Sequence, residues 1–292
     1  MRKLMRAYRV AYDGRPYAGF QRQPHAKTVE GTLLAALADH DVLDRGDGPT
    51  HATPPGYAAA GRTDAGVSAV AQTVAFDAPT WLSPRAFNAT LPDSIRVWAA
   101  ADVSTAFHAT HDATARTYRY HLYAPLEELP DDEPAIDEDV LVAALDRLSG
   151  EHDFHNLTTD ETGTVRDVRA TVTRSGDVLR VEVGADGFPR ALVRRLVAAA
   201  TRVARGAAAA SLLDRLLEPE PVPGEYGVGP APATPLVLWD VSYPGVSFDV
   251  DETAAASARD AFGSRHRDAS RAAAVTEALC ARVASAADTS RR

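Results

Sequence analysis

The sequence is almost without cysteine, because Cys280 is the only one in 292 residues. A lone cysteine cannot form an internal disulfide, and it excludes a zinc site built from several cysteines. No apolar run approaches the roughly 18 residues that a helix needs to cross a bilayer, and the N-terminal residues lead into a strand pattern rather than an apolar secretory segment. We therefore expect a soluble, cytoplasmic protein with no membrane partner.

Lysine is also scarce. It occurs only as Lys3 and Lys27, so arginine supplies nearly all of the positive charge, and the formal net charge is -9. An acidic surface suits a salt-rich cytoplasm, although a GC-rich genome would also replace lysine with arginine. The acidic average argues against a protein that binds nucleic acid through bulk charge. Any site for a polyanion must therefore be local and built from arginine.

The order of predicted strands and helices is similar in the two halves of the chain. The first half contains strands at 6–12, 57–60, 67–76 and 94–103, and helices that begin after Thr28 and at Pro84. The second half contains strands at 116–123, 168–174, 178–185 and 236–243, and helices at 140–148 and 190–205. This repetition predicts an α+β fold in which two ferredoxin-like lobes form one duplicated, mixed or antiparallel sheet with a cleft between them.

Three parts follow from this order. We expect an N-terminal lobe over residues 1–105, a C-terminal lobe over residues 106–246, and a helical extension over residues 247–292. The extension is rich in alanine and carries Val275, Leu279 and Val283 at helical spacing.

The most distinctive stretch runs from Gly61 to Ala69. Its glycines bracket Arg62-Thr63-Asp64, and a strand pattern follows at once, which predicts a hairpin-like loop with Asp64 at its apex beside a guanidinium group. In isolation, such a stretch is usually a turn in which Thr63 and Asp64 bond their own backbone. Other motifs in the chain are therefore needed to tell whether this stretch is an ordinary turn or part of a functional site.

The predicted helix at 190–205 has an unusual polar face. Its arginines fall within an arc of about 140°, opposite an apolar face, and no lysine or acid lies among them. A solvated helix face normally mixes charges of both signs. The arginines are Arg190, Arg194, Arg195, Arg202 and Arg205.

Other candidate site residues have ordinary explanations when taken singly. Tyr118 and Tyr120 lie on one face of a predicted strand, where most such pairs are packing residues. His152 and His155 are too few for a metal site and lack the HExxH arrangement, so we expect no metal.

The collinear set is more specific than its members. It comprises Tyr12-Asp13-Gly14, Phe20-Gln21 with Gln23, Gly61 to Val67, Phe107-His108-Ala109, Arg116-x-Tyr118-x-Tyr120, Gly150-Glu151-His152-Asp153-Phe154, Gly187-Phe188, Val193-Arg194, and Ala231-Pro232 before Leu236 to Tyr243. In this order the motifs resemble the TruA family of tRNA pseudouridine synthases, over roughly residues 6–243. Phe20 stands where the family usually has tryptophan, and Ser68 where it usually has histidine.

The resemblance implies isomerisation of uridine to pseudouridine at positions 38, 39 and/or 40 of the tRNA anticodon stem-loop. It implies a homodimeric enzyme without a cofactor. Asp64 would be the nucleophile, because an ionised carboxylate can attack a sugar carbon and hold one fragment covalently. Attack on the ribose, elimination to a glycal and addition to the uracil ring all stay open at this point.

The resemblance also assigns roles to other residues. Arg194 would pair with Asp64 and favour its ionised form. Tyr118 would stack on the uracil and take part in proton transfer. Further substrate contacts would come from Arg62, Phe20, Gln21 and His108.

Two other functions compete with this one. The first is a catalytically silent RNA-binding protein on the same scaffold. The second is a glycoside or nucleoside hydrolase, for which a second acid near Asp64 would be expected, and no acidic motif accompanies the Asp64 loop in the sequence.

Overall fold

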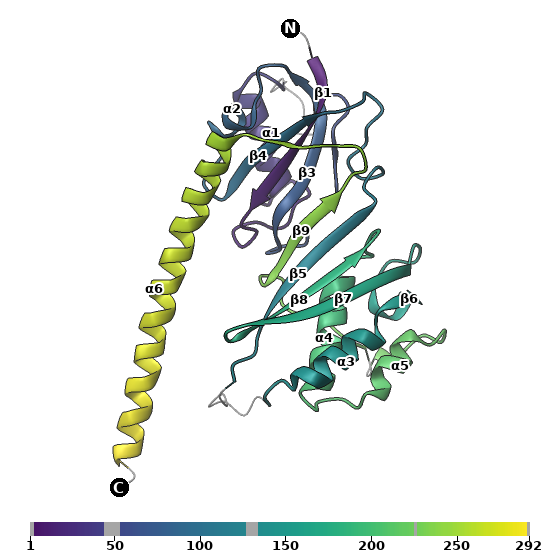
Figure 1. Cartoon of the computed structure of the whole chain (residues 1–292), viewed down its shortest axis with the longest axis vertical. Coiled ribbons are helices and arrows are strands. Elements are labelled where there is room, and N and C mark those ends of the chain that lie inside the picture. Colours follow the sequence, from purple (N-terminus) through teal and green to yellow (C-terminus); the bar gives the residue numbers. More distant parts are fainter. Residues whose placement is uncertain (1–2, 44–52, 127–133, 225–226, 291–292) are drawn as a thin grey trace.

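The computed structural model describes residues 3–43, 53–126, 134–224 and 227–290 (Figure 1). The strands are β1 (Lys3–Tyr12), β2 (Ala58–Ala59), β3 (Ser68–Pro79), β4 (Ile95–Asp102), β5 (Ala115–Tyr123), β6 (Gly150–Asp153), β7 (Val165–Ser175), β8 (Val178–Ala185), β9 (Leu236–Ser242) and β10 (Asp249–Val250). The helices are α1 (Val29–Asp39), α2 (Pro84–Asn88), α3 (Glu138–Arg147), α4 (Leu192–Ala204), α5 (Ser211–Leu217) and α6 (Glu252–Ser290). Parts of the loops predicted at 44–56 and 127–139 lie outside the described residues.

The strands form one 10-stranded sheet in the order β10-β4-β1-β3-β9-β5-β8-β7-β6, with β2 paired to β3. Most neighbours are antiparallel, whereas β3 and β9 run parallel through the pairs Ser68↔Val237 and Ala69↔Leu238. The predicted α+β class with a shared mixed sheet is therefore confirmed.

Two clusters of buried apolar side chains lie along this sheet. One surrounds β1 and β3, where the rings of Tyr8 and Phe76 stack with their centroids 5.2 Å apart. The other lies where α3 and α4 pack, and it includes Leu141 and Leu196. We propose that the clusters mark the cores of two lobes, the first over residues 1–105 and the second over residues 106–246.

Side-chain caps define the start of both helices in the first lobe. Thr28 Oγ1 accepts a hydrogen bond from the amide of Gly31 (3.2 Å) ahead of α1. Ser83 caps α2 in the same way, and Pro84 follows at the first helical position, where its missing N–H has no partner to lose. Both helix starts agree with the sequence prediction, and α1 places the loop that precedes it beside the loop of Asp64.

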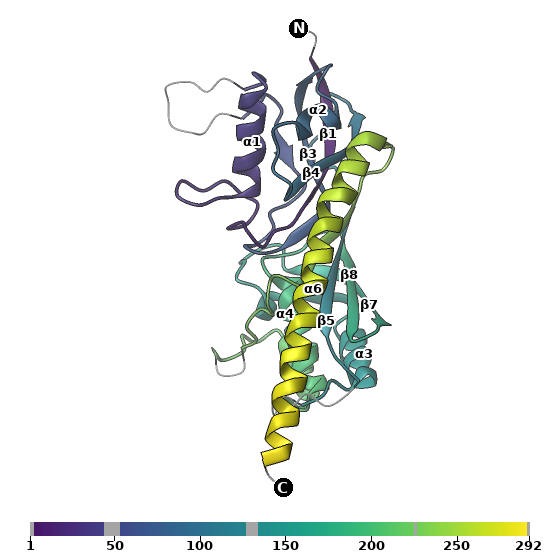
Figure 2. The ribbon, with the colours of Figure 1, turned by 90° about the vertical axis from the view of Figure 1, so that its left-hand side faces the viewer.

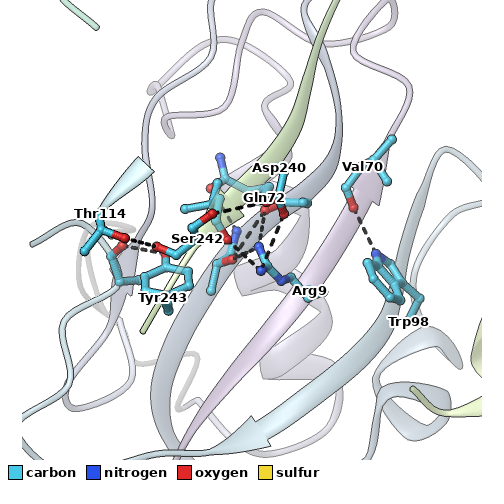
Figure 3. Close-up of polar contacts among 12 residues, drawn as sticks. Arg9, Val70, Gln72, Trp98, Thr114, Asp240, Ser242 and Tyr243 are labelled. Carbon is cyan, nitrogen blue, oxygen red and sulfur yellow. Dashed lines mark hydrogen bonds and ion pairs between the residues drawn. The ribbon is translucent and has the colours of Figure 1, made fainter. Parts of the chain in front are cut away.

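A buried arginine joins the two lobes at the seam between β3 and β9 (Figure 3). Arg9 on β1 is 8% exposed, and it donates to Thr73 Oγ1 on β3 (3.1 Å) and to the carbonyl of Val241 on β9 (2.6 Å). Its guanidinium carbon also lies 4.2 Å from the centroid of the Phe248 ring. The relative position of the lobes thus depends on one desolvated cation as well as on backbone pairing.

The extension after β9 begins as part of the first lobe. β10 pairs with β4, and the first turns of α6 pack there through Ala254 and Ala258, which are 1% and 8% exposed. α6 then runs alongside the molecule and past the second lobe (Figures 1 and 2). Its apolar residues Val275, Leu279 and Val283 are 61%, 62% and 68% exposed. Among the described residues, no helix combines the length and apolarity that spanning a bilayer requires.

Candidate active site

The loop between β2 and β3 carries Asp64. Gly66 in this loop has a φ of +83°, and a Cβ at this position would lie 3.4 Å from Thr234 Cγ2. Gly61 has no positive φ, and a Cβ there would meet nothing within 4 Å. The conformation of the loop therefore requires glycine at position 66 but not at position 61.

Thr63 and Asp64 use their side chains for contacts with distant residues. The hydroxyls of Thr63 and Tyr12 are 2.8 Å apart in the buried core, and Asp64 Oδ2 accepts a hydrogen bond from Arg194. The local bond in the loop is a backbone one, from the amide of Val67 to the carbonyl of Asp64 (3.1 Å). The structure therefore does not have the simple turn in which these side chains bond their own backbone.

Residues 12–20, which we call the cradle, pack against the loop and hold it through hydrogen bonds. The cradle and the loop are joined by hydrogen bonds from Gly14 N to Ser68 Oγ (3.0 Å), from Gly66 N to Tyr17 O (3.3 Å) and from Phe20 N to Thr63 O (3.0 Å). A Cβ at Gly14 would lie 2.0 Å from the carbonyl oxygen of Val67, so only glycine permits this contact. The position of Asp64 is thus set by the cradle.

Asp64 forms an ion pair with Arg194, the first-turn arginine of α4. Arg194 Nη1 lies 2.8 Å from Asp64 Oδ2, and the side chains of Arg194 and Asp64 are 16% and 38% exposed. Arg194 Nε also donates to the carbonyl of Ala231 (2.7 Å), which fixes the guanidinium group. The pair holds one oxygen of Asp64 in a charge-assisted hydrogen bond, and the other oxygen stays available to a ligand.

Tyr118 on β5 stands beside this pair. Its ring meets Phe188 edge to face, with the centroids 5.3 Å apart. Burial raises the pKa of Tyr118 to about 12; the charge of Arg116 opposes this rise, and the charge of Asp64 adds to it. The hydroxyl therefore carries its proton at neutral pH and acts there as a hydrogen-bond donor.

A cleft of about 940 Å³ opens above these side chains, large enough for a nucleotide. It is lined by all seven of the side chains that the sequence suggested as site residues: Asp64, Arg194, Tyr118, Arg62, Phe20, Gln21 and His108. They come from both proposed lobes and from five separate stretches of the chain. The fold therefore gathers a carboxyl group, a guanidinium group and an aromatic hydroxyl in one cleft.

Comparison with known proteins identifies the family. A sequence profile described as tRNA pseudouridine synthase matches residues 144–244. The tRNA pseudouridine synthase A of Haloarcula marismortui is 59% identical over 274 residues, which cover 94% of this chain and 98% of that protein. The chain belongs to the tRNA pseudouridine synthase A family. The resemblance seen in the sequence is thereby confirmed, and the chain is an enzyme of the isomerase class.

More distant proteins match as well. The tRNA pseudouridine synthase A of Methanococcoides burtonii is 37% identical, and the match covers 82% of each chain. Among solved structures, the crystal structure of the archaeal box H/ACA sRNP Nop10-Cbf5 complex matches with a TM-score of 0.32 and 15% identity, over 68% of this chain and 43% of that chain.

Phe20 is the most buried of the suggested substrate contacts. It lines the cleft, but its side chain is 1% exposed and packs near the ring of Tyr12, with the centroids 6.3 Å apart. Its backbone amide also holds the loop, through the hydrogen bond to the carbonyl of Thr63. Gln21, Arg62 and His108 are exposed at the cleft.

The row of arginines predicted on α4 does not face the cleft as a unit. Arg190 and Arg194 line the cleft, whereas Arg195, Arg202 and Arg205 are not among its lining residues. Arg190 also precedes the helix, because Ala191 at the N-cap adopts a left-handed φ of +57° and α4 begins at the next residue. The cleft is therefore lined by fewer arginines of this row than the sequence pattern indicated.

Several residues of the cleft were missed in the sequence. Two are acids: Asp160 Oδ2 accepts from the amide of Arg190 (2.7 Å), and Glu30 Oε2 accepts from the amide of Arg22 (2.7 Å). No motif surrounds either acid, so no sequence signal could have found them. Phe188 belonged to a recognised motif, but its contact with Tyr118 joins residues 70 positions apart.

Arg116 is a further missed residue, and it secures the loop to the second lobe. Its guanidinium group donates to the carbonyl oxygens of Ala60 (2.9 Å), Thr110 (2.8 Å) and Asp186 (2.6 Å). Ala60 directly precedes the Asp64 loop. The alternation of Arg116 with the two tyrosines on β5 was visible in the sequence, but its long-range partners were not.

The two histidines considered for a metal have other contacts. His152 Nε2 lies 3.0 Å from the carbonyl of Ser149, and His155 Nδ1 lies 3.4 Å from Asp153 Oδ1. Within the described ranges of the chain, there is no group of three or more side chains placed to hold a metal ion.

Proposed function

We propose that this enzyme isomerises uridine to pseudouridine at positions 38, 39 and/or 40 in the anticodon stem-loop of tRNA, with Asp64 as the nucleophile. The observation that carries the proposal is the Asp64 carboxylate, held 2.8 Å from Arg194 at the wall of a nucleotide-sized cleft beside Tyr118. The names of the relatives support tRNA as the substrate.

The reaction breaks the bond between uracil N1 and the ribose and forms a bond from uracil C5 to the same ribose carbon. C5 gives up a proton and N1 gains one, so the product is an isomer and no further reactant is needed. The Asp64 carboxylate supplies the temporary covalent partner, and its ion pair with Arg194 holds it in the cleft. Tyr118 stacks on the uracil and, because it keeps its proton, donates a hydrogen bond.

The target uridine lies in or beside an RNA stem, so it must leave the stack to reach Asp64, at an expense of a few kcal/mol. Exposed guanidinium groups at the cleft offset this by gripping the neighbouring phosphates, and Arg62 and Arg190 are so placed. A few such contacts suit a chain whose net charge is -9. We also propose that the enzyme acts as a homodimer in the cytoplasm, as the family resemblance implies.

A hydrolase would need a second acid near Asp64, and Asp160 and Glu30 do share the cleft with it. Both acids, however, accept hydrogen bonds from backbone amides, and Asp160 lies 4.0 Å from Arg190 Nε, farther than the 2.8 Å between Asp64 and Arg194. The contacts thus favour a single reactive carboxylate.

One assay separates the candidates. The enzyme is incubated with a tRNA transcript that carries tritium at uracil C5, and the wild type is compared with Asp64→Ala and with Asp146→Asn, an exposed acid on α3. We expect tritium release by the wild type and by the Asp146 control, and none by Asp64→Ala. Free uracil in the product would indicate a hydrolase, and the absence of release by the wild type would indicate an RNA-binding protein.

A further inference from the structure

The helix α6 touches the support of the catalytic loop through one side chain. Arg265 Nη1 donates to Asp13 Oδ2 at 2.8 Å, and the side chains of Arg265 and Asp13 are 35% and 8% exposed. Asp13 follows the last residue of β1 and lies in the cradle. The C-terminal helix therefore contacts the cradle, and the cradle in turn contacts the loop of Asp64.

Asp13 is a buried carboxylate with two cationic partners. Arg15 binds both of its oxygens, through Nε to Oδ1 (2.8 Å) and through Nη2 to Oδ2 (2.8 Å), and Arg265 is the second cation on Oδ2. Burial raises the pKa of Asp13, but the bonds from Arg15 and the charge of Arg265 outweigh it and hold the pKa below its ordinary value. Asp13 is therefore ionised at neutral pH, and loss of Arg265 would leave Oδ2 with one of its two cationic donors and leave Arg15 as the one cation of the pair.

The next residue transmits the position of Asp13 to the loop. Gly14 lies in backbone contact with Val67, and its amide donates to Ser68 Oγ, three and four residues after Asp64. Because the contact leaves no space for a Cβ, a shift of Asp13 must move Gly14 and with it the end of the loop. Through this contact, a shift in the position of Asp13 would displace the carboxylate of Asp64.

We propose that Arg265 and Asp13 are positioning residues, through which α6 holds the cradle and hence the catalytic loop in the geometry for reaction. This rests on the proposed role of Asp64 as the nucleophile. It gives the C-terminal helix a part in catalysis rather than in binding alone. Arg265 is suited to this part because it faces the first lobe, whereas Arg271 pairs with Asp268 of its own helix.

The test compares kcat and KM for tRNA in the full-length enzyme with Arg265→Gln, Arg265→Lys and Asp13→Asn. The matched control is Arg267→Gln, which removes the same charge from an exposed position on the same helix. We expect Arg265→Gln to lower kcat about tenfold and to change KM by less than about twofold, because the loop is displaced while the RNA surface is intact. Arg265→Lys restores the cation and should recover most of kcat, and the control should match the wild type.

A double variant separates this linkage from general destabilisation. If Arg265 acts through Asp13, then Asp13→Asn with Arg265→Gln should have the same kcat as Asp13→Asn alone, within about twofold. All rates are measured below the thermal midpoint of each variant, so that unfolded protein does not contribute. Unchanged kcat in both Arg265 variants, or fully additive losses in the double variant, would overturn the proposal. Activity in Asp64→Ala would instead overturn the proposed function, so the two failures are distinguishable.

Discussion

At the scale of single residues, the site depends on how Arg194 is held. Its Nη1 binds Asp64, and its Nε binds the carbonyl of Ala231, so the guanidinium group is fixed from two sides. If Asp64 is the nucleophile that we propose, it must leave the ion pair during the reaction, and a fixed guanidinium group does not follow it. On that proposal, the charge of Arg194 serves the chemistry more than RNA binding.

This separation leads to a prediction for Arg194→Leu. We expect kcat to fall by about 100-fold or more, because the carboxylate loses its stabilising cation, while the affinity for tRNA changes by less than about threefold. Single-turnover kinetics and a filter-binding assay measure the two quantities separately. Arg202→Leu, an exposed arginine farther along α4, is the control and should retain both. A fully active Arg194→Leu would remove this arginine from the mechanism.

At the scale of elements, the sequence predicted those helices and strands that carry their own local signals. The caps Thr28 and Ser83, and the alternation along β5, are such signals. α5 lacks a side-chain cap and has seven residues, and β10 is defined only by its pairing with β4. Elements of this kind exist because of their neighbours, so the sequence could not indicate them.

The candidate site was predictable to a similar extent. The chemistry of Asp64, Arg194 and Tyr118 follows from a family resemblance, and the structure gathers all three in one cleft. The burial of individual side chains was not predictable. The resemblance suggests that Phe20 contacts the substrate, yet its ring is enclosed in the core. Exposure of a single ring depends on tertiary packing, which a motif does not record.

The contact between the cradle and the loop predicts a contrast between two glycines. Gly14→Ala places a methyl group 2.0 Å from the carbonyl oxygen of Val67, so the backbone must shift, and we expect the free energy of unfolding to fall by about 2 to 4 kcal/mol. Gly61→Ala meets open space at an ordinary φ, and we expect a change within about 0.5 kcal/mol. Urea unfolding monitored by circular dichroism measures both, and equal stabilities of the two variants would contradict the assigned contact.

At the scale of the whole molecule, the proposed mechanism requires the alignment of the two proposed lobes, because Asp64 comes from the first and Arg194 and Tyr118 come from the second. Backbone pairing between β3 and β9 joins the lobes at Ser68 and Ala69, close to the loop itself. Arg9 strengthens this seam from within the core.

Arg9→Met should therefore weaken the whole molecule. The substitution keeps an unbranched side chain but leaves the carbonyl of Val241 and the hydroxyl of Thr73 without this donor, and we expect a loss of about 3 kcal/mol in the free energy of unfolding. Arg147→Met breaks an ion pair with Asp214 in which both side chains are more than half exposed, so it should change stability by less than about 1 kcal/mol. Chemical denaturation compares the two, and equal losses would contradict the role of Arg9 at the seam.

The most direct test of the nucleophile is Asp64→Asn, which keeps the shape of the side chain and removes its charge. Pseudouridine formation is measured in a single turnover with tRNA bound at saturation, and the dissociation constant is measured in parallel. We predict that binding stays within about threefold of the wild type and that the rate of pseudouridine formation falls by about 10⁴-fold or more. A variant that binds tRNA normally and reacts within tenfold of the wild-type rate would contradict the account.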